Sequence, residues 1–135
     1  DRMSSYVVSR LIKEMTKIHI NLEKSKVLIM GVTFKENCPD LRNSKVLDMI
    51  CELREYNVAV DVYDPWISKN EFPSNIDCNF IDDLEDYLYD GLILAVPHKE
   101  FMQLDPSSFR DLCKTESIVF DLKSVLSIDS SDLRL

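Results

Sequence analysis

The sequence predicts an α/β domain in which a mostly parallel sheet carries helices on both faces and a long helix precedes the first strand. Two observations support this fold class. Short apolar runs that resemble buried strands alternate with helical patterns along the chain. Hydrophobic residues make up 45% of the 135 residues, which is enough for the core of one domain.

The first element is expected to be a helix over residues 3–20. Apolar residues recur there at spacings of three and four, and the stripe they form contains Met3, Tyr6, Val7, Val8, Leu11, Ile12, Met15 and Ile18. This helix comes before any strand. We therefore expect it to be a connecting or docking helix rather than a helix of the sheet layers.

Five apolar runs predict the strands, at residues 26–30, 58–63, 78–81, 91–96 and 117–120. Between them, Ser44 is a typical N-cap for a helix over residues 45–56, and residues 82–89 suggest a short acidic helix. Pro106 is suited to the first turn of a helix over residues 106–114, with Asp105 as its cap. The order after the first helix is thus β-α-β-(β)-α-β-α-β, which predicts a Rossmann-like parallel sheet.

Composition restricts the partners and the compartment. The formal net charge of −8 disfavours nucleic acid and anionic membranes as partners. No apolar run has the roughly 20 residues that a membrane helix needs, and the first residues do not resemble a signal peptide. The four cysteines form no CxxC pair and no metal-like spacing, so we expect reduced thiols, no bound metal and a cytoplasmic protein.

Ligands of parallel sheets bind beyond the carboxyl ends of the strands. That rule places residues 31–43, 64–66, 97–99 and 121–124 on one functional edge. Polar and basic side chains gather before the helix at 45–56, at Thr33, Lys35, Asn37, Arg42, Asn43 and Lys45. They suit an anionic ligand such as a phosphate, but a solvated polar loop diluted by Glu36 and Asp40 is an equal alternative.

Other chemistries are disfavoured. A single glycine, Gly31, follows the first strand, so the glycine-rich turn of a dinucleotide site is missing, and Asp64 is interpreted as part of an Asp-Pro turn. Cys38 and His98 are assigned packing roles rather than nucleophilic catalysis. The carboxylates near residue 84 are interpreted as a solvated helix face, so no catalytic residue and no metal ligand are expected.

The stretch GVTFKENCPDLRNSK at residues 31–45 is longer and more specific than these features. Together with Tyr63-Asp64-Pro65, the PHKEF segment at 97–101 and FDLKSVL at 120–126, it resembles the C-terminal UDP-binding domain of the UDP-glucose/GDP-mannose dehydrogenase family. The residues of the first motif are most similar to those of the branch that oxidises UDP-N-acetyl-hexosamines, which includes enzymes of Vi-type polysaccharide synthesis.

The resemblance implies a UDP-sugar-binding domain of an enzyme that oxidises the C6 alcohol of the sugar to a carboxylate with NAD. Residues 1–22 would belong to a central helix that joins two subunits, and residues 23–135 would form the UDP-binding domain of a longer, homo-oligomeric enzyme. The catalytic cysteine and most of the NAD site would lie in the remainder of that enzyme, so this chain alone should be inactive. A non-catalytic oligomerisation module and a receiver-like α/β module are the alternatives.

The resemblance also implies roles for individual residues. Phe34 and Lys35 would contact UDP, and Arg42 would reach across a domain interface towards NAD. Lys123 would lie near the nucleotide, with Ser124 as the alternative if the alignment is shifted by one residue.

Overall fold

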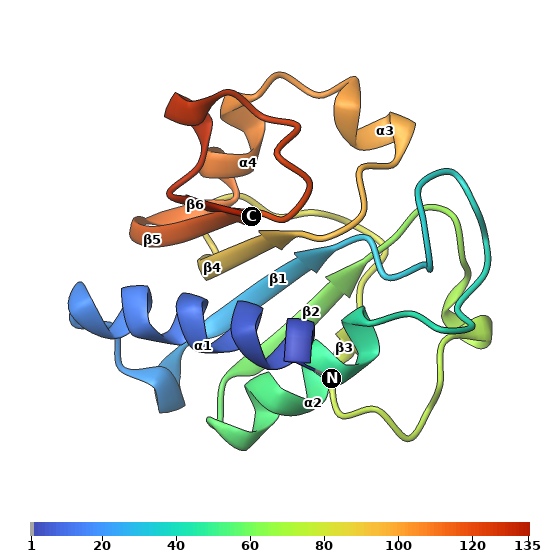
Figure 1. Ribbon diagram of the computed structural model, residues 1–135, viewed down its shortest axis with the longest axis horizontal. Coiled ribbons are helices and arrows are strands. Elements are labelled where there is room, and N and C mark those ends of the chain that lie inside the picture. Colours follow the sequence, from blue (N-terminus) through green and yellow to red (C-terminus); the bar gives the residue numbers. More distant parts are fainter. Residues whose placement is uncertain (1) are drawn as a thin grey trace.

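The computed structural model describes residues 2–135, which form a six-stranded sheet flanked by helices (Figure 1). The strands are β1 (Lys26–Met30), β2 (Ala59–Tyr63), β3 (Asn79–Phe80), β4 (Tyr89–Leu94), β5 (Cys113–Asp121) and β6 (Leu133–Arg134). The helices are α1 (Arg2–Lys17), α2 (Val46–Glu55), α3 (Lys99–Met102) and α4 (Ser107–Asp111), with 3-10 turns η1 (Leu22–Lys24), η2 (Lys69–Glu71) and η3 (Ile128–Ser130). All neighbouring strands are parallel, in the order β3-β2-β1-β4-β5-β6. This is the strand order of a Rossmann-like sheet, so the predicted fold class is confirmed.

The sheet has a hydrophobic cluster on each face. Successive residues of a strand point to opposite faces. Accordingly, Val27 and Ile29 of β1 join the cluster beneath α1 and α2, whereas Leu28 and Met30 join the cluster that contains Phe101 of α3 and Phe109 of α4. Both faces of β1 are therefore buried, which is why its sequence is a continuous apolar run rather than an alternating one.

Helix α1 is part of the sheet layers, so the expectation of a docking helix outside them is wrong. Its Val7, Val8, Leu11 and Met15 side chains are completely buried in the first cluster, and the helix contacts α2, β4 and β5 (Figure 1). A Cβ built on Gly91 of β4 would lie only 3.3 Å from Met15 Sδ, which shows how closely the helix lies on the sheet. The division of the chain at residue 22 stays a prediction.

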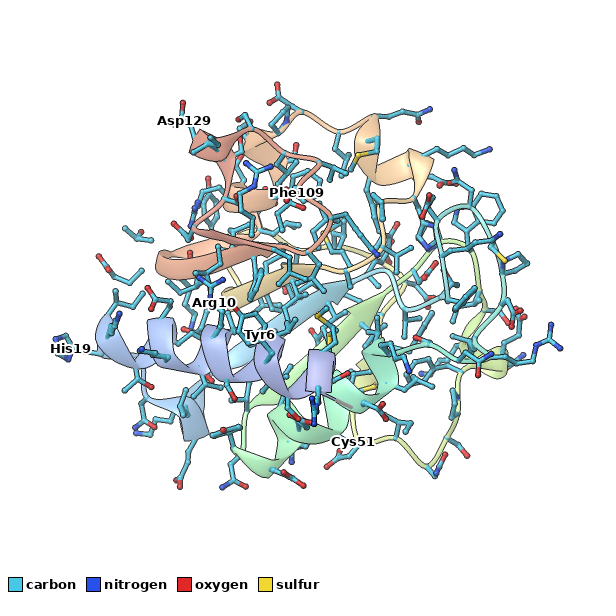
Figure 2. The ribbon with its side chains drawn as sticks, in the orientation of Figure 1. Tyr6, Arg10, His19, Cys51, Phe109 and Asp129 are labelled. Atoms are coloured by element: carbon cyan, nitrogen blue, oxygen red, sulfur yellow. The ribbon has the colours of Figure 1, made fainter. Side chains whose placement is uncertain are left out.

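Helix α1 ends earlier than the pattern predicts. His19 has φ 66°, and the backbone N–H of Ile20 donates to the carbonyl of Met15 at 3.1 Å, which closes the helix in a Schellman-like turn. The Arg10 guanidinium lies over the rings of Tyr6 and Phe120, at 5.8 and 5.7 Å from their centroids. Figure 2 shows Arg10 and Tyr6 on α1. Among residues 2–135, no helix is long and apolar enough to cross a bilayer.

The predicted acidic helix at residues 82–89 is wrong. The chain forms bends and turns there, and Tyr89 already begins β4. Tyr87 has φ 59°, which a regular right-handed helix does not tolerate. The N–H groups of Tyr87 and Leu88 instead donate to the carbonyls of Asp111 and Leu112, at 2.9 and 3.1 Å. Bonds to the end of α4 thus replace the bonds that a helix would make within itself.

Several boundaries also differ from the prediction. Helix α4 stops at Asp111, because β5 begins at Cys113 and not at residue 117. Asp105 caps α4 as predicted, since its carboxylate accepts the Ser107 N–H at 3.0 Å. Ser44 likewise accepts the Val46 N–H at 3.3 Å at the start of α2. The short elements α3 and β6 were not predicted, because four- and two-residue segments carry too little periodicity.

Candidate functional site

A cavity of about 300 Å³ lies at the carboxyl ends of β1, β4 and β5. The strand order reverses between β1 and β4, and the loops that follow both strands line the cavity. Such a reversal leaves a crevice where ligands of parallel sheets bind. The lining comes from both chain ends, α2 and three loops, and consists of Met3, Thr33, Phe34, Lys35, Glu36, Asn43, Lys45, Val46, Met49, Ala95, Val96, Leu122, Lys123 and Leu135.

The lining is basic although the chain as a whole is acidic. Its charged side chains are those of Lys35, Lys45, Lys123 and Glu36. Phe34 adds an aromatic ring that is 54% exposed. Positive charge beside an exposed ring suits a ligand with an anionic part and a flat aromatic part.

Gly31 fixes the path of the chain from β1 into the site. Its φ is 89°, and a Cβ built on it would lie 2.6 Å from Val96 Cβ and 2.8 Å from the Val96 carbonyl oxygen. Only glycine fits there, so the loops after β1 and β4 can pass against each other. Residues 31–45 separate β1 from α2, so no helix begins directly after Gly31. This path differs from the glycine-rich turn of a dinucleotide site, which leads from a strand directly to the N-terminus of a helix.

The loop after β1 is closed by its own hydrogen bonds. The Phe34 N–H donates to the Asp40 carbonyl at 2.7 Å, and the Thr33 hydroxyl donates to the Lys35 carbonyl at 2.9 Å. The Phe34 and Lys35 side chains are left exposed on the cavity lining. The structure thus brings these two predicted residues together, beside Lys123.

The turn after β5 decides which of two neighbouring side chains reaches the cavity. The buried Asp121 carboxylate accepts the N–H groups of Lys123 and Leu126, at 3.2 and 2.8 Å. Ser124 has φ 53°, and its hydroxyl donates to the Leu135 carbonyl at 2.8 Å. Lys123 lines the cavity, whereas Ser124 does not.

Arg42 lies outside the cavity lining. Its guanidinium donates two hydrogen bonds of 3.0 Å to the two oxygens of Asp40, and its side chain is 88% exposed. Hydrogen bonds from the Arg42 side chain and backbone lower the pKa of Asp40, and Asp40 raises the pKa of Arg42. Arg42 therefore does not share the site of Phe34, Lys35 and Lys123.

Asp64 and His98 do not line the cavity; their side chains are hydrogen-bonded to each other and to the loops near it. The buried Asp64 carboxylate accepts the N–H groups of Val32 and Trp66, both at 2.8 Å, and contacts His98 Nε2 at 3.0 Å. His98 is completely buried. These contacts agree with an Asp-Pro turn and with a packing role for the histidine.

Sequence reasoning did not assign Met3 or Leu135 to the site, and it named Lys45 only as a candidate in the basic loop pattern, without a role at UDP. Met3 and Leu135 come from opposite ends of the chain, and only the folded sheet brings them to the same cavity. For Lys45 a signal existed, because it directly precedes α2 and belongs to the basic loop pattern.

Two of the cysteines are disfavoured as activated nucleophiles. All four are free thiols. Burial raises the pKa of Cys113 to about 11, and burial followed by nearby acidic groups raises the pKa of Cys78 to about 11. A raised pKa reduces the thiolate fraction at neutral pH. Within residues 2–135, no group of three or more His, Cys, Asp or Glu side chains could hold a metal ion.

Known proteins resemble this chain over its whole length. It is 48% identical over 135 residues to a UDP-N-acetyl-D-glucosamine 6-dehydrogenase of Pseudomonas aeruginosa, covering all of this chain and 32% of that protein. It is 42% identical over 135 residues to a protein of the same name from Salmonella typhi, again covering 100% of this chain and 32% of that protein. The chain thus spans about a third of the length of these relatives.

A solved structure shares the fold. The NDP-N-acetyl-D-galactosaminuronic acid dehydrogenase of Methanosarcina mazei Go1 superposes with a TM-score of 0.80 at 16% identity, over 95% of this chain and 26% of that one. The sequence profile of the UDP-glucose/GDP-mannose dehydrogenase family, UDP binding domain, matches residues 28–128. These residues include most of β1, all of β4 and β5, and the loops after these strands that line the cavity, so the chain belongs to the UDP-glucose/GDP-mannose dehydrogenase family and carries its UDP-binding domain.

Proposed function

We propose that this chain binds the UDP part of a UDP-sugar within a dehydrogenase that oxidises the sugar C6 alcohol to a carboxylate. The observation that carries the proposal is the cavity at the β1–β4 reversal, where an exposed aromatic ring and lysines meet in an otherwise acidic domain. The family supports UDP as the ligand. The names of the two similar proteins favour a UDP-N-acetyl-hexosamine as the substrate.

Each proposed ligand residue has a distinct task. Phe34 presents a face on which the uracil ring can stack, an interaction worth about 1–3 kcal/mol per base. Lys35 and Lys123 approach the cavity from the loops after β1 and β5, so they can hold the diphosphate from two sides. Lysine suits this task as a flexible point charge.

The role of the domain in catalysis would be positional. Binding energy from the nucleotide fixes the distant sugar against reactive groups elsewhere in the enzyme. NAD would be bound mainly by another domain of the enzyme. Arg42 is exposed and outside the UDP cavity, so it is placed to contribute one cation to that cofactor across an interface.

We also propose that the enzyme is a cytoplasmic homo-oligomer and that residues 1–22 contribute to its subunit contacts. Tyr6 and Met3 support this idea, because they are 52% and 48% exposed although α1 buries its opposite side. Sedimentation of the intact enzyme with Tyr6→Glu should show dissociation if the outer side of α1 joins subunits. An unchanged sedimentation coefficient would remove α1 from the interface.

Calorimetric titration of the full-length enzyme with UDP and with uridine tests the main proposal. Lys35→Met should weaken UDP binding by roughly tenfold to a hundredfold, since a hydrogen bond to a charged group contributes about 1.5–3 kcal/mol. Uridine lacks phosphates, so its affinity should hardly change. Phe34→Leu should weaken the binding of both UDP and uridine, because both carry the uracil ring that stacks on Phe34.

Lys69→Met is the matched control, because Lys69 is exposed and lies outside the cavity lining. It removes the same charge from the chain and should leave both affinities unchanged. Equal effects of the two lysine substitutions on UDP would show that net charge, and not this cavity, governs binding.

A further inference from the structure

We propose that His98 is a positioning residue for the UDP site. As a neutral imidazole with its proton on Nε2, it fastens the loop that carries Phe34 and Lys35 to the Asp64 carboxylate. This inference rests on the proposed function of that loop. His98 is completely buried and does not line the cavity, so it acts through the loop and not on the ligand.

The Nδ1 atom of the ring identifies the tautomer. The backbone N–H of Asn37 donates to His98 Nδ1 at 3.0 Å. A ring nitrogen that accepts a hydrogen bond carries no proton, so the proton of a neutral imidazole must then be on Nε2.

The Nε2 atom has partners that fit this assignment. It lies 3.0 Å from Asp64 Oδ2 and 3.3 Å from the Thr33 hydroxyl oxygen. The Thr33 hydroxyl donates its own proton to the Lys35 carbonyl, so its oxygen can only accept from the ring. Both ring nitrogens of His98 are therefore satisfied in one protonation state.

One ring thus holds both ends of the ligand-facing segment. Thr33 is attached on the Nε2 side and Asn37 on the Nδ1 side, and the exposed Phe34 and Lys35 side chains lie between these two points. Asn37 adds a second attachment, because its side-chain oxygen accepts the Lys99 N–H at 2.8 Å. Holding a loop in its binding conformation removes an ordering cost that the ligand would otherwise have to overcome.

Packing explains why the ring itself is fixed. Its centroid lies 5.9 Å from Trp66 in a stacked arrangement and 5.6 Å from Phe101 in a tilted one. Because β2 supplies Asp64 through the turn after it, the ring connects the loops that follow β1, β2 and β4. Through these contacts, residues 33–37 beside the cavity are attached to loops that the sheet holds in place.

The first test is the nitrogen NMR spectrum of the His98 ring in the 135-residue chain. This chain contains the hydrophobic clusters on both faces of the sheet, so it includes the core of the fold. Long-range proton–nitrogen correlation at pH 7 should show an unprotonated Nδ1 and a protonated Nε2. A proton on Nδ1, in either the other tautomer or an imidazolium, would overturn the inference whether or not UDP binds.

The second test compares substitutions by UDP titration, followed through backbone amide shifts of the cavity residues. His98→Phe keeps an aromatic ring but removes both nitrogens, so UDP affinity should fall roughly tenfold. His98→Asn keeps an acceptor near the Nδ1 position and should stay within about threefold of the wild type. Phe109→Leu is the control for packing lost elsewhere in the same hydrophobic cluster, and it should leave the affinity unchanged.

The outcomes distinguish a failure of the positioning role from a failure of the proposed function. If the wild-type chain binds UDP and His98→Phe binds it equally well, the positioning role is overturned while the proposed function stands. If neither the chain at millimolar UDP nor the full-length enzyme in calorimetry binds UDP, the proposed function and the ligand half of this inference both fail. Should His98→Phe not fold, His98→Asn is compared with His98→Gln, which keeps only a donor towards Asp64. Equal affinities of these two variants would then overturn the role of the Asn37 bond.

Discussion

Replacing Gly31 by alanine should destabilise the domain strongly. Gly31 combines a φ of 89° with a site where a Cβ would lie 2.6 Å from Val96 Cβ and 2.8 Å from the Val96 carbonyl oxygen. The backbone can hardly yield, because the Gly31 N–H donates to the Tyr63 carbonyl at 2.9 Å. Substitution would therefore separate the loops after β1 and β4.

The magnitude follows from two terms. A left-handed conformation costs an L-residue about 1–2 kcal/mol, and overpacking of a closed site costs about 1–3 kcal/mol. Gly31→Ala should thus lower the free energy of unfolding by roughly 2–5 kcal/mol, out of the roughly 5–15 kcal/mol typical of a domain. UDP binding should weaken as well, because Val96 lines the cavity.

Gly91→Ala is the matched control. Its added Cβ would meet flexible side-chain atoms, Val27 Cγ2 at 3.1 Å and Met15 Sδ at 3.3 Å, and no positive φ is involved. The loss should stay near 1 kcal/mol, since side chains can move by the few tenths of an ångström required. Urea unfolding, followed by the fluorescence of the single tryptophan, measures both variants. Equal losses would refute the argument from φ and from the Val96 contact.

Three further predictions concern ionisable groups. Tyr89→Phe removes the hydroxyl that donates to Asp61 at 2.6 Å and should lower the unfolding free energy at pH 7 by about 1–3 kcal/mol. Burial, and after it the contact with Asp61, raise the pKa of Tyr89. The hydroxyl therefore stabilises the fold fully below the unfolded-state pKa of about 10, and this stabilisation is lost as the pH rises further. Between pH 9 and pH 11 the unfolding free energy, measured by urea denaturation, should fall more steeply for the wild type than for the variant. Arg42→Gln should raise the pKa of Asp40 part of the way to its ordinary value, because the guanidinium hydrogen bonds that lower it are lost while the backbone N–H of residue 42 still donates to Asp40. Carboxyl-carbon NMR measures this pKa, and an unchanged value would exclude the ion pair. Burial raises the pKa of both Cys113 and Cys78 to about 11, but only Cys113 is buried, whereas Cys78 is partly exposed. Cys113 should therefore be the last of the four thiols to react with iodoacetamide at pH 8, and peptide mass mapping that finds it labelled first would contradict its burial.

The sheet was predictable because its strands are encoded locally. Runs such as the one that forms β1 are apolar on both faces, and the helical pattern between them leaves few alternatives to parallel pairing. The position of the site followed from the same order, since loops after parallel strands share one edge. The structure accordingly places Phe34, Lys35 and Lys123 around one cavity, as this reasoning requires.

The remaining features depend on contacts between distant residues. The acidic stretch before β4 has the composition of a helix, but its N–H groups bond to the end of α4, which no local pattern reveals. Met3 and Leu135 reach the cavity only after the chain ends have folded onto the sheet. The apolar stripe of α1 was recognised but assigned to a partner outside the sheet, because periodicity shows that a face is buried and not what buries it.

Two buried carboxylates explain how an acidic chain can present a basic site. Asp64 and Asp121 lie at or just after the ends of β2 and β5, and each carboxylate accepts hydrogen bonds from two or more backbone N–H groups of the loops around the cavity. Their charge is therefore directed at the backbone and away from solvent, and the hydrogen bonds compensate for its burial. The loops held in this way carry Lys35 and Lys123, which are exposed and line the cavity. A diphosphate in the cavity would thus contact lysines, while the buried carboxylates that hold the lysine-bearing loops would not face it. The net charge of −8 is the sum over all ionisable groups and does not describe where they lie.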